Sequence, residues 1–395
     1  MGSKTEKVDV LLIGGGVASV RCARTLRRHG FTGSIALVGD ERTPPYNRPP
    51  LSKELLRDDL PDELALAEPE AWYVRRDIDL RLDMAVRELD AGARTATLAD
   101  GTRIAFDKCL LATGAEPRVP RIPGAERALL LRTIEDARAI RASALPGARA
   151  VVIGGGFIGV EVASSLATLG VEATVVELTH MLWSGALGDE LAAWARDRLE
   201  DAGVTFLTAA AADAIEAEGV RVGDRLLEAD FVIAGIGVVP RVELARAAGL
   251  GVDDGIVTDA RHETTAPGIF AAGDVARVSG VRVEHWHAAR EGGERAALAM
   301  LEQPLTPHRA PWVFSEVEGH QLDVVGIATE WDHTRRIGEG DRFAVAHVGE
   351  GHVVQVAIVN GALPVEETRA LVERGSGFAE IERMGVSAGL TRAPR

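Results

Sequence analysis

Two stretches of the chain share the same order of apolar and polar positions. In each, a short apolar run ends in three glycines, and apolar residues then recur at helical spacing. The first reads VDVLLIGGGVASVRCARTLRRHG from Val8, and the second reads ARAVVIGGGFIGVEVASSLATLGVEATVVEL from Ala148. A strand, a glycine turn and a helix in this order predict a β-α-β unit. The chain therefore contains two such units.

Small residues occupy the three positions of the pattern G-x-G-x-x-G/A in both turns. They are Gly14, Gly16 and Ser19 in the first turn, and Gly154, Gly156 and Gly159 in the second. Glycine lets the backbone turn tightly and approach a pyrophosphate, which then rests on the helix N-terminus. Both turns therefore predict a dinucleotide site.

Acidic residues end the strand that follows each helix. The run SIALVGDE ends in Asp40 and Glu41, which are candidates for binding a ribose hydroxyl. Glu177 ends the corresponding run of the second unit, 18 residues after Gly159. An acid at this distance binds the adenosine 2′-hydroxyl and repels a 2′-phosphate, so the second unit favours NAD over NADP.

A third apolar run, GIFAA, is followed directly by Gly273 and Asp274. Its carboxylate is placed to hold the ribityl and pyrophosphate region of a flavin, and a plain turn after a buried strand is the alternative. Two dinucleotide sites are most economically explained by FAD and NAD(P)H, because a flavin accepts a hydride from nicotinamide.

Composition narrows the class of protein. A chain of 395 residues, 46% apolar and 26% charged, predicts a globular protein of two or three domains. It contains no run of 18 apolar residues, and its start lacks the features of a signal peptide, so we expect neither a membrane span nor export. The net charge of −15 argues against nucleic acid as a partner. Cys22 and Cys109, 87 residues apart, suit neither a disulfide framework nor a metal site, and favour a cytoplasmic protein.

Residues 44–53, PPYNRPPLSK, form a stiff loop with four prolines in seven positions. Proline fixes φ and removes a donor, so this loop is neither a helix interior nor a central strand. It carries Arg48 and Lys53.

With these pieces in place, the chain resembles the FAD-dependent ferredoxin–NAD reductases of bacterial oxygenase systems. Relatives of that family include rubredoxin reductases and apoptosis-inducing factor. The resemblance runs from about Val8 to the C-terminus and is carried, in the family's order, by LIGGGVAS, PPYNRPPLSKELL, LLATGAEPR, LRTIEDA, VVIGGGFIGVEVA, GIGVVP, IFAAGDVA and VEHWHAA.

The resemblance implies a glutathione-reductase-like α/β architecture, with two Rossmann-like dinucleotide-binding domains (FAD and NAD) and a C-terminal α+β domain. The implied boundaries are 5–117 and 246–305 for the FAD domain, 118–245 for the NAD domain and 306–395 for the C-terminal domain. Within the last, RFAVAHV and HVVQVAIVN alternate as a hairpin would, and PVEETRALVERG reads as a helix.

The family match also gives the proline loop a target. It implies that Arg48 contacts FAD, that Lys53 lies near the N5 edge of the flavin, and that Glu161 pairs with Lys53. A cation near the ring stabilises the reduced, anionic flavin, and its carboxylate partner fixes the lysine. The alternative is a solvated lysine on a surface turn.

Further contacts are implied residue by residue. For FAD these are Arg132, the backbone of Val86, His285, Trp286 and Phe314; for NAD they are Ile158, Gly237 and Glu284. Without the family match, Arg132 reads as an ordinary charge at a helix start. His285 and His287 alone are poor evidence for a metal site, and we expect no metal.

Residues 43–60 contain no cysteine, although relatives that reduce disulfides keep redox cysteines near the flavin. Cys22 and Cys109 read as small core residues. The implied route is therefore hydride transfer from NADH to the flavin, followed by two one-electron transfers to an iron–sulfur protein.

The chain departs from the family in two places. Where the family reads P-x-F-W-S-D-Q, this chain has Phe314 for Trp, Glu316 for Asp and Val317 for Gln. The stretch LTHMLWSGALGDE after Glu177 lacks the arginines that the family often has, which favours NADH further but removes possible pyrophosphate contacts.

The leading interpretation is an NADH-dependent reductase that passes electrons through FAD to a ferredoxin serving a cytochrome P450 or Rieske oxygenase. The alternatives are another acceptor, such as rubredoxin or dioxygen, and an NADH-sensing flavoprotein like apoptosis-inducing factor. We expect a monomer or homodimer. Docking of an acidic ferredoxin needs a basic patch, although dispersed arginines are mostly solvated surface. The candidates are Arg75, Arg76, Arg282, Arg290, Arg335 and Arg336.

Overall fold

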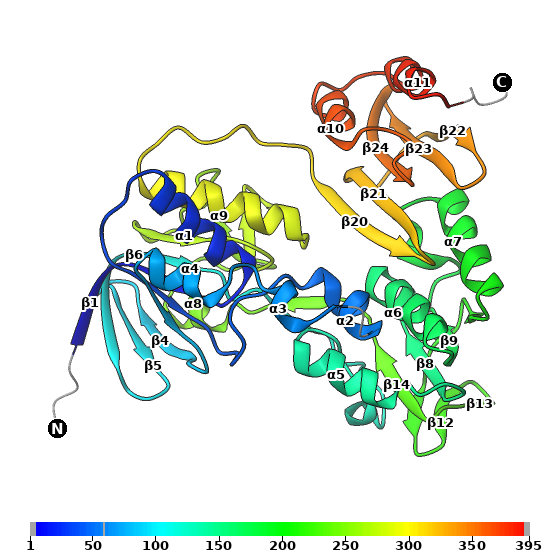
Figure 1. Cartoon of the computed structure of the whole chain (residues 1–395), viewed down its shortest axis with the longest axis horizontal. Coiled ribbons are helices and arrows are strands. Elements are labelled where there is room, and N and C mark those ends of the chain that lie inside the picture. Colours follow the sequence, from blue (N-terminus) through cyan, green and yellow to red (C-terminus); the bar gives the residue numbers. More distant parts are fainter. Residues whose placement is uncertain (1–4, 58–59, 391–395) are drawn as a thin grey trace. The chain divides into compact units, whose positions relative to one another are not determined.

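The computed structural model describes residues 5–57 and 60–390, so the last five residues of the predicted C-terminal domain lie outside it (Figure 1). The chain divides into two compact units. The first contains Met1–Arg48, Pro61–Glu116 and Val238–Pro307, and the second contains Pro49–Leu60, Pro117–Gly237 and His308–Arg395. This division groups the NAD and C-terminal segments together and places 238–245 with the FAD segments. The boundaries between three domains stay a prediction.

The first unit is built on a seven-stranded sheet. Its strands are β1 (Thr5–Ile13), β2 (Ile35–Val38), β3 (Ile78–Arg81), β4 (Val86–Asp90), β5 (Thr95–Leu98), β6 (Arg103–Leu111) and β17 (Ile269–Ala271). The order is β3-β2-β1-β6-β5-β4, with β17 also paired to β6. Strands β3, β2, β1, β6 and β17 are parallel, and β5 runs antiparallel to the start of β6. Strands β1 and β2 are the two strands of the first predicted β-α-β unit.

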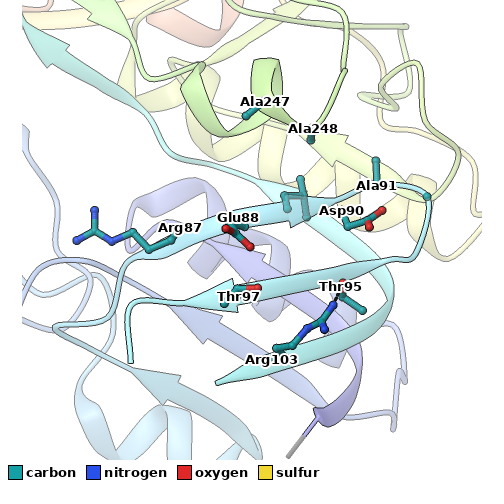
Figure 2. A pocket seen from close by; sticks show the side chains of 11 residues that line it. Arg87, Glu88, Asp90, Ala91, Thr95, Thr97, Arg103, Ala247 and Ala248 are labelled. Carbon is teal, nitrogen blue, oxygen red and sulfur yellow. Dashed lines mark hydrogen bonds between the residues drawn. The ribbon is translucent and has the colours of Figure 1, made fainter. Parts of the chain in front are cut away.

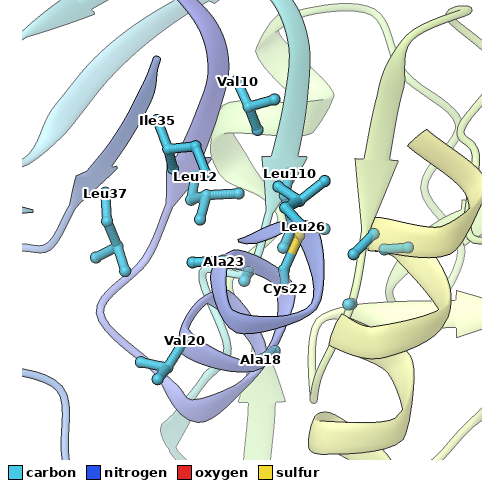
Figure 3. Packing of buried hydrophobic residues seen from close by; sticks show 14 of the residues in the cluster. Val10, Leu12, Ala18, Val20, Cys22, Ala23, Leu26, Ile35, Leu37 and Leu110 are labelled. Carbon is cyan, nitrogen blue, oxygen red and sulfur yellow. The ribbon is translucent and has the colours of Figure 1, made fainter. Parts of the chain in front are cut away.

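Helices α1 (Val17–Arg28) and α9 (Trp286–Met300) lie side by side in this unit (Figure 1). A Cβ at Gly293 would lie 2.1 Å from the carbonyl oxygen of Ala18, so glycine permits this close approach. Figure 3 shows Cys22 and Leu26 of α1 among Leu110 and the other strand residues of one apolar cluster. This core fixes α1 directly after the glycine turn.

Smaller elements complete the first unit. They are α3 (Asp62–Ala65), α4 (Glu70–Arg75), α8 (Glu243–Ala247), and the sheet of β16 (Ile256–Thr258), β18 (Ala276–Val278) and β19 (Val281–Arg282). Strands β7 (Ala115–Pro117) and β15 (Val238–Pro240) form a two-stranded sheet. Within 5–57 and 60–390, no helix is both long and apolar enough to cross a membrane.

The second unit contains a four-stranded parallel sheet in the order β10-β9-β8-β14. The strands are β8 (Arg149–Ile153), β9 (Glu172–Val176), β10 (Thr205–Leu207) and β14 (Phe231–Ala234), and the helices are α5 (Ile134–Ser143), α6 (Phe157–Thr168) and α7 (Asp189–Asp201). An antiparallel sheet of β11 (Ala214–Glu216), β12 (Gly219–Val222) and β13 (Arg225–Glu228) follows. Strand β8, α6 and β9 are the second predicted β-α-β unit.

A five-stranded antiparallel sheet in the order β20-β21-β24-β23-β22 lies C-terminal to these elements in the second unit. Its strands are β20 (Trp312–Val317), β21 (His320–Gly326), β22 (His333–Glu339), β23 (Arg342–Gly349) and β24 (His352–Val359), and α10 (Val365–Glu373) and α11 (Phe378–Ser387) follow. The predicted hairpin is confirmed by the antiparallel pairing of β23 with β24, and the predicted helix by α10.

Candidate functional site

The first glycine turn leaves the start of α1 open. Gly14 has φ +115°, and a Cβ there would lie 2.1 Å from the carbonyl oxygen of Ala112. Among the described residues, nothing lies within 4 Å of a Cβ built on Gly16, and no side chain caps α1. The hydroxyl of the fully buried Ser19 likewise has no hydrogen-bond partner in this part of the chain. Unsatisfied N–H groups at a glycine turn fit a dinucleotide pyrophosphate.

The two acids after β2 have different partners. Strand β2 ends at Val38, earlier than the predicted run SIALVGDE. Asp40 forms an ion pair of 2.9 Å with Arg241. Glu41 accepts a hydrogen bond of 2.6 Å from Arg48 and one of 2.5 Å from the hydroxyl of Tyr46. Glu41 is therefore held by the proline-rich loop.

Arg48, Asp274 and His285 come together in the first unit from three distant segments. Burial opposes the charge of Arg48, yet the negative potential of Tyr46, Glu41 and Asp274 raises its pKa. Burial lowers the pKa of His285, and Asp274 opposes that shift. Asp274 thus interacts electrostatically with both predicted FAD residues.

The start of α9 carries the next predicted contacts. Trp286, its first residue, donates a hydrogen bond of 2.9 Å from Nε1 to Asn47. The guanidinium of Arg290 lies 4.4 Å from the centroid of the Trp286 ring, within cation–π range. Glu284 is ion-paired with Arg282. Val86 is half-buried and begins β4, opposite Leu98.

The second glycine turn repeats the first within the second unit. Gly154 has φ +107°, and its N–H donates to the carbonyl of Val176 at 2.9 Å, as Gly14 donates to Val38 at 2.8 Å. A Cβ on Gly159 would lie 1.9 Å from the carbonyl oxygen of Gly154, so only glycine fits. Within the described chain, a Cβ on Gly156 would meet nothing within 4 Å and α6 lacks a side-chain cap. This helix start also fits a pyrophosphate.

Glu177 directly follows the last residue of β9 and is only 6% exposed. Its carboxylate accepts hydrogen bonds from the N–H of Gly155 at 2.6 Å and from the N–H of Thr179 at 2.8 Å. The residue at the equivalent position after β2 is Gly39. Counting from the strand end therefore locates the acid of the second unit but not that of the first.

Two predicted NAD residues lie near the same turn. Ile158, in the first turn of α6, is 41% exposed, which is unusual for an isoleucine and leaves it accessible to a ligand. Gly237 has φ +93°, and its carbonyl accepts a hydrogen bond of 2.9 Å from the N–H of Arg118.

Lys53 is buried, so the alternative of a solvated surface lysine is wrong. It lies between the 3-10 helix η1 (Pro49–Ser52) and α2 (Glu54–Arg57), and its Nζ is 2.9 Å from Oε2 of Glu161. The same oxygen accepts a hydrogen bond of 2.5 Å from Ser52, and Oε1 accepts one of 2.7 Å from Ser315. Ser165 donates to the carbonyl of Ser52 at 2.7 Å. Both oxygens of the buried carboxylate are therefore satisfied.

Phe314 and Arg132 lie in the same unit as this pair. The ring centroid of Phe314 is 5.9 Å from Nζ of Lys53. Arg132 directly precedes Thr133, the N-cap of α5, and its N–H donates to Asp136 at 2.9 Å. Of the two other departures from the family, Glu316 pairs with Arg57 at 3.0 Å and Val317 is fully buried.

Comparison with known proteins identifies the family. The family model for pyridine nucleotide-disulphide oxidoreductases matches residues 8–293. The chain belongs to this family. The ferredoxin–NAD(+) reductase component of the biphenyl dioxygenase system of Paraburkholderia xenovorans is 37% identical over 81% of each chain. The rubredoxin–NAD(+) reductase of Pseudomonas putida is 32% identical over 82% of this chain and 88% of that protein.

Comparison with solved structures points to the same kind of protein as these relatives. A crystal structure of the covalent putidaredoxin reductase–putidaredoxin complex matches with a TM-score of 0.91 and 29% identity, over 97% of this chain and 99% of that one. The predicted fold class is confirmed: Rossmann-like FAD and NAD domains with a C-terminal sheet domain, as in glutathione-reductase-like flavoproteins. The protein is an FAD- and NAD-dependent oxidoreductase, and its resemblance to ferredoxin–NAD reductases is confirmed.

Unlike family members that work through a disulfide, this oxidoreductase has both of its thiols in its core. Cys22 and Cys109 are free and fully buried, and burial raises the pKa of each thiol. Their predicted role as small core residues is confirmed. Neither thiol is available to exchange with a substrate.

The arginines predicted to dock an acidic acceptor differ in their surroundings. Arg282 pairs with Asp254 at 3.2 Å and with Glu284, and Arg336 pairs with Glu190 at 2.9 Å, so their charges are largely neutralised. Arg75 and Arg76 are exposed. Arg335 is exposed and lies 5.6 Å from the ring centroid of Phe378.

A pocket of about 440 Å³ lies in the first unit, between the β4–β5 hairpin and the end of α8 (Figure 2). Arg87, Glu88, Asp90 and Arg103 line it with charges of both signs. None of the predicted site residues lines this pocket. It therefore takes no part in the function proposed below.

Proposed function

We propose that the protein is an NADH-dependent reductase that passes electrons through FAD to a small iron–sulfur ferredoxin serving a cytochrome P450 or Rieske oxygenase. The observation that carries this proposal is the buried Lys53–Glu161 pair, 2.9 Å apart, in a chain whose two thiols are both inaccessible. A charged lysine in place of a thiol relay suits direct transfer to a one-electron carrier.

The residues of each unit are assigned to a cofactor. In the first unit we assign FAD contacts to Gly14, Gly16, Ser19, Asp40, Glu41, Arg48, Val86, Asp274, His285 and Trp286. In the second unit we assign FAD contacts to Lys53, Arg132 and Phe314, and NAD contacts to Gly154, Gly156, Ile158, Gly159, Glu177 and Gly237. We assign Glu284 of the first unit to NAD as well. Bound FAD supplies the chemistry of accepting two electrons from NADH and releasing them singly.

Lys53 supplies a positive charge in a buried setting. Its electrostatic effect is stronger there than in water because the local dielectric is low. Glu161 holds the ammonium group in place, and the hydroxyls of Ser52 and Ser315 hold Glu161. Because the carboxylate is already paired, Lys53 stays fixed while charge develops nearby.

NADH is the proposed donor, rather than NADPH. Glu177 is buried at the end of β9, and residues 178–188 contain no arginine to neutralise a 2′-phosphate. A fixed carboxylate without a compensating cation repels that phosphate.

The acceptor is proposed from the relatives and from exposed cations. The similar proteins are reductases of a ferredoxin, a rubredoxin or putidaredoxin. Arg75 and Arg76, exposed at the C-terminal end of α4, are available to an acidic partner. Rubredoxin stays the second candidate, because a relative with that activity is 32% identical.

The test is NADH-dependent cytochrome c reduction by the purified, FAD-loaded protein, with and without a [2Fe–2S] ferredoxin from the same genome. A large ferredoxin-dependent increase is expected. A matching rubredoxin is tested in parallel, and stimulation by rubredoxin alone would reassign the acceptor. Rapid flavin bleaching without transfer to either carrier, with a long-lived reduced complex, would instead indicate an NADH sensor.

A further inference from the structure

Residues 178–188, here called the strap, connect the end of β9 to α7 in the second unit. Leu182, Trp183 and Leu187 of the strap are at most 3% exposed. Trp183 adopts φ +57°, which is uncommon for a residue other than glycine and persists only when its surroundings hold it. The strap is therefore an ordered, tightly packed segment. Its two ends contact different parts of the second unit.

One end of the strap is bonded to the second glycine turn. The N–H of Trp183 donates to the carbonyl of Gly155 at 2.8 Å, and the N–H of Gly155 donates to Glu177 at 2.6 Å. The Trp183 ring lies 5.9 Å from that of Phe157, the first residue of α6. A Cβ on Gly155 would lie 3.0 Å from Leu182. Movement of the strap would therefore move the turn that we assign to NAD.

The other end is bonded to the C-terminal sheet. Gln355 of β24 donates from Nε2 to the carbonyl of Ala186 at 2.9 Å, and Nε2 of His347 of β23 lies 3.1 Å from the carbonyl oxygen of Leu187. A carbonyl only accepts, so Nε2 of His347 carries the proton. His347 is fully buried and Gln355 is 3% exposed. Gly188 has φ +77°, and a Cβ there would lie 3.1 Å from Nε2 of His347.

Only three residues of chain separate Trp183 from Leu187, so the sheet contacts restrict the turn contacts directly. Loss of the His347 donor leaves the carbonyl of the buried Leu187 unpaired, and loss of the Gln355 donor removes the sheet contact of the Ala186 carbonyl. In either case the strap gains from shifting to reach water. A shift of this kind would release Trp183 from Gly155 and disturb Glu177. Neither His347 nor Gln355 needs to touch the dinucleotide to have this effect.

We propose that His347 and Gln355 are positioning residues through which the C-terminal sheet sets the affinity for NAD. This inference rests on the proposed assignment of the second glycine turn and Glu177 to NAD. It adds that a sheet to which we assign no NAD contact of its own fixes that site.

The experiment measures equilibrium binding of NAD⁺ to the oxidised, FAD-loaded protein by calorimetry. His347→Ala and Gln355→Met should each raise the dissociation constant about fivefold to tenfold, which corresponds to about 1 to 1.4 kcal/mol. His347→Gln should restore most of the affinity, because its amide can also donate to Leu187. With ferricyanide as acceptor, KM for NADH should rise while kcat changes less than twofold.

A matched control lies on the same sheet. His352 of β24 also contacts a backbone carbonyl, with Nδ1 2.5 Å from the oxygen of Gly375, but that contact does not involve the strap. His352→Ala should leave NAD⁺ binding unchanged. If His347→Ala does not fold, Gln355→Met carries the test.

Three results would overturn the proposal: an NAD⁺ dissociation constant within twofold of wild type in the folded variants, an equal loss of affinity in His352→Ala, or no rescue by His347→Gln. Measuring Glu177→Ala alongside distinguishes a failure of the positioning role from a failure of the assigned NAD site. If it weakens NAD⁺ binding and the sheet variants do not, only the positioning role fails. If it has no effect either, the assigned NAD site fails and this inference falls with it.

Discussion

Ser315 of β20 and Glu161 of α6 lie 2.7 Å apart, hydroxyl to carboxylate, although 154 residues separate them in the chain. The other carboxylate oxygen of Glu161 accepts a hydrogen bond from Ser52 and forms the ion pair with Lys53. The same helix begins at the second glycine turn. One helix therefore carries both the proposed NAD pyrophosphate site, at its N-terminus, and the carboxylate that fixes Lys53.

Replacing Lys53 by methionine should slow flavin reduction by NADH. The change keeps the length of the side chain and removes its charge. We expect a loss on the order of 100-fold, the lower end of the range for removing one preorganised electrostatic group. The measurement is anaerobic stopped-flow absorbance of the flavin, at equal FAD content. An unchanged rate would exclude a role of this charge in the reaction.

Stability must be separated from rate in this experiment. Lys53→Met leaves Glu161 buried without its cation, and breaking a buried pair costs about 3–5 kcal/mol. The double variant Lys53→Met/Glu161→Gln removes the uncompensated charge and should recover most of the melting temperature. Its flavin reduction should stay slow. Recovery of the rate together with the stability would show that misfolding, not charge, caused the loss.

Replacing Glu177 by alanine should weaken the preference for NADH over NADPH. The ratio of the two kcat/KM values should fall at least about tenfold, which is about 1.4 kcal/mol. Part of the loss comes from lower use of NADH, because the N–H groups of Gly155 and Thr179 lose their acceptor. Steady-state kinetics with ferricyanide as acceptor measure kcat/KM for NADH and for NADPH.

An exposed acid on the same strand provides the control. Glu172 begins β9 and points to solvent, so Glu172→Ala should leave the preference unchanged. Glu177→Gln keeps an acceptor for Gly155 but loses the charge, and should relax the preference with a smaller loss of NADH use. A preference that survives Glu177→Ala would mean that another residue discriminates against the 2′-phosphate.

Local sequence patterns located the parts of the site that depend on local geometry. The glycines of both turns and Glu177 follow from spacing, because a β-α-β unit places them within one short stretch. The same counting did not distinguish Asp40 from Glu41. Strand β2 ends at Val38, and Gly39 takes the position that Glu177 has in the other unit. Contacts with Arg48 and Arg241, rather than spacing, set these two acids apart.

The missed residues are buried polar side chains whose partners are distant in sequence. Ser52 is 109 residues from Glu161, and His347 is 160 residues from Leu187. The spacing of apolar and polar residues along the chain carries no information about such a pair. A weak signal existed in RFAVAHVG, where a histidine interrupts a strand of buried residues and so needs a buried partner. Likewise, the sequence could not show that Arg336 is neutralised by Glu190.

Thiol chemistry should be dispensable. Under native conditions a soluble thiol reagent should modify neither Cys22 nor Cys109, since burial in an apolar cluster raises the pKa of each thiol. Figure 3 shows the cluster around Cys22. Both should react once the protein is unfolded. The variant Cys22→Ala/Cys109→Ala should keep its reductase rate and lose about 1 kcal/mol of stability per site. Rapid native modification with loss of activity would contradict the buried, non-catalytic assignment.

Acid should destabilise the protein through its buried histidines. Burial lowers the pKa of His347 below the value of 6.5 for a free histidine. Backbone hydrogen bonds with Leu187 and Gln355, and the charge of Glu190, only partly offset this. Below pH about 6.5 this histidine is therefore protonated in the unfolded chain but not yet in the folded chain, so the free energy of unfolding falls as pH falls. The contribution approaches about 1.4 kcal/mol per pH unit for one group.

His347→Gln isolates this contribution, since glutamine keeps a donor for Leu187 but does not titrate. Melting temperatures measured between pH 7.5 and 5 should fall less steeply in this variant than in the wild type. His285, whose pKa burial also lowers, keeps part of the slope in both proteins. His352→Gln changes an exposed histidine of the same sheet, and its curve should follow the wild type. Identical slopes for His347→Gln and the wild type would mean that His347 takes up its proton without unfolding the sheet.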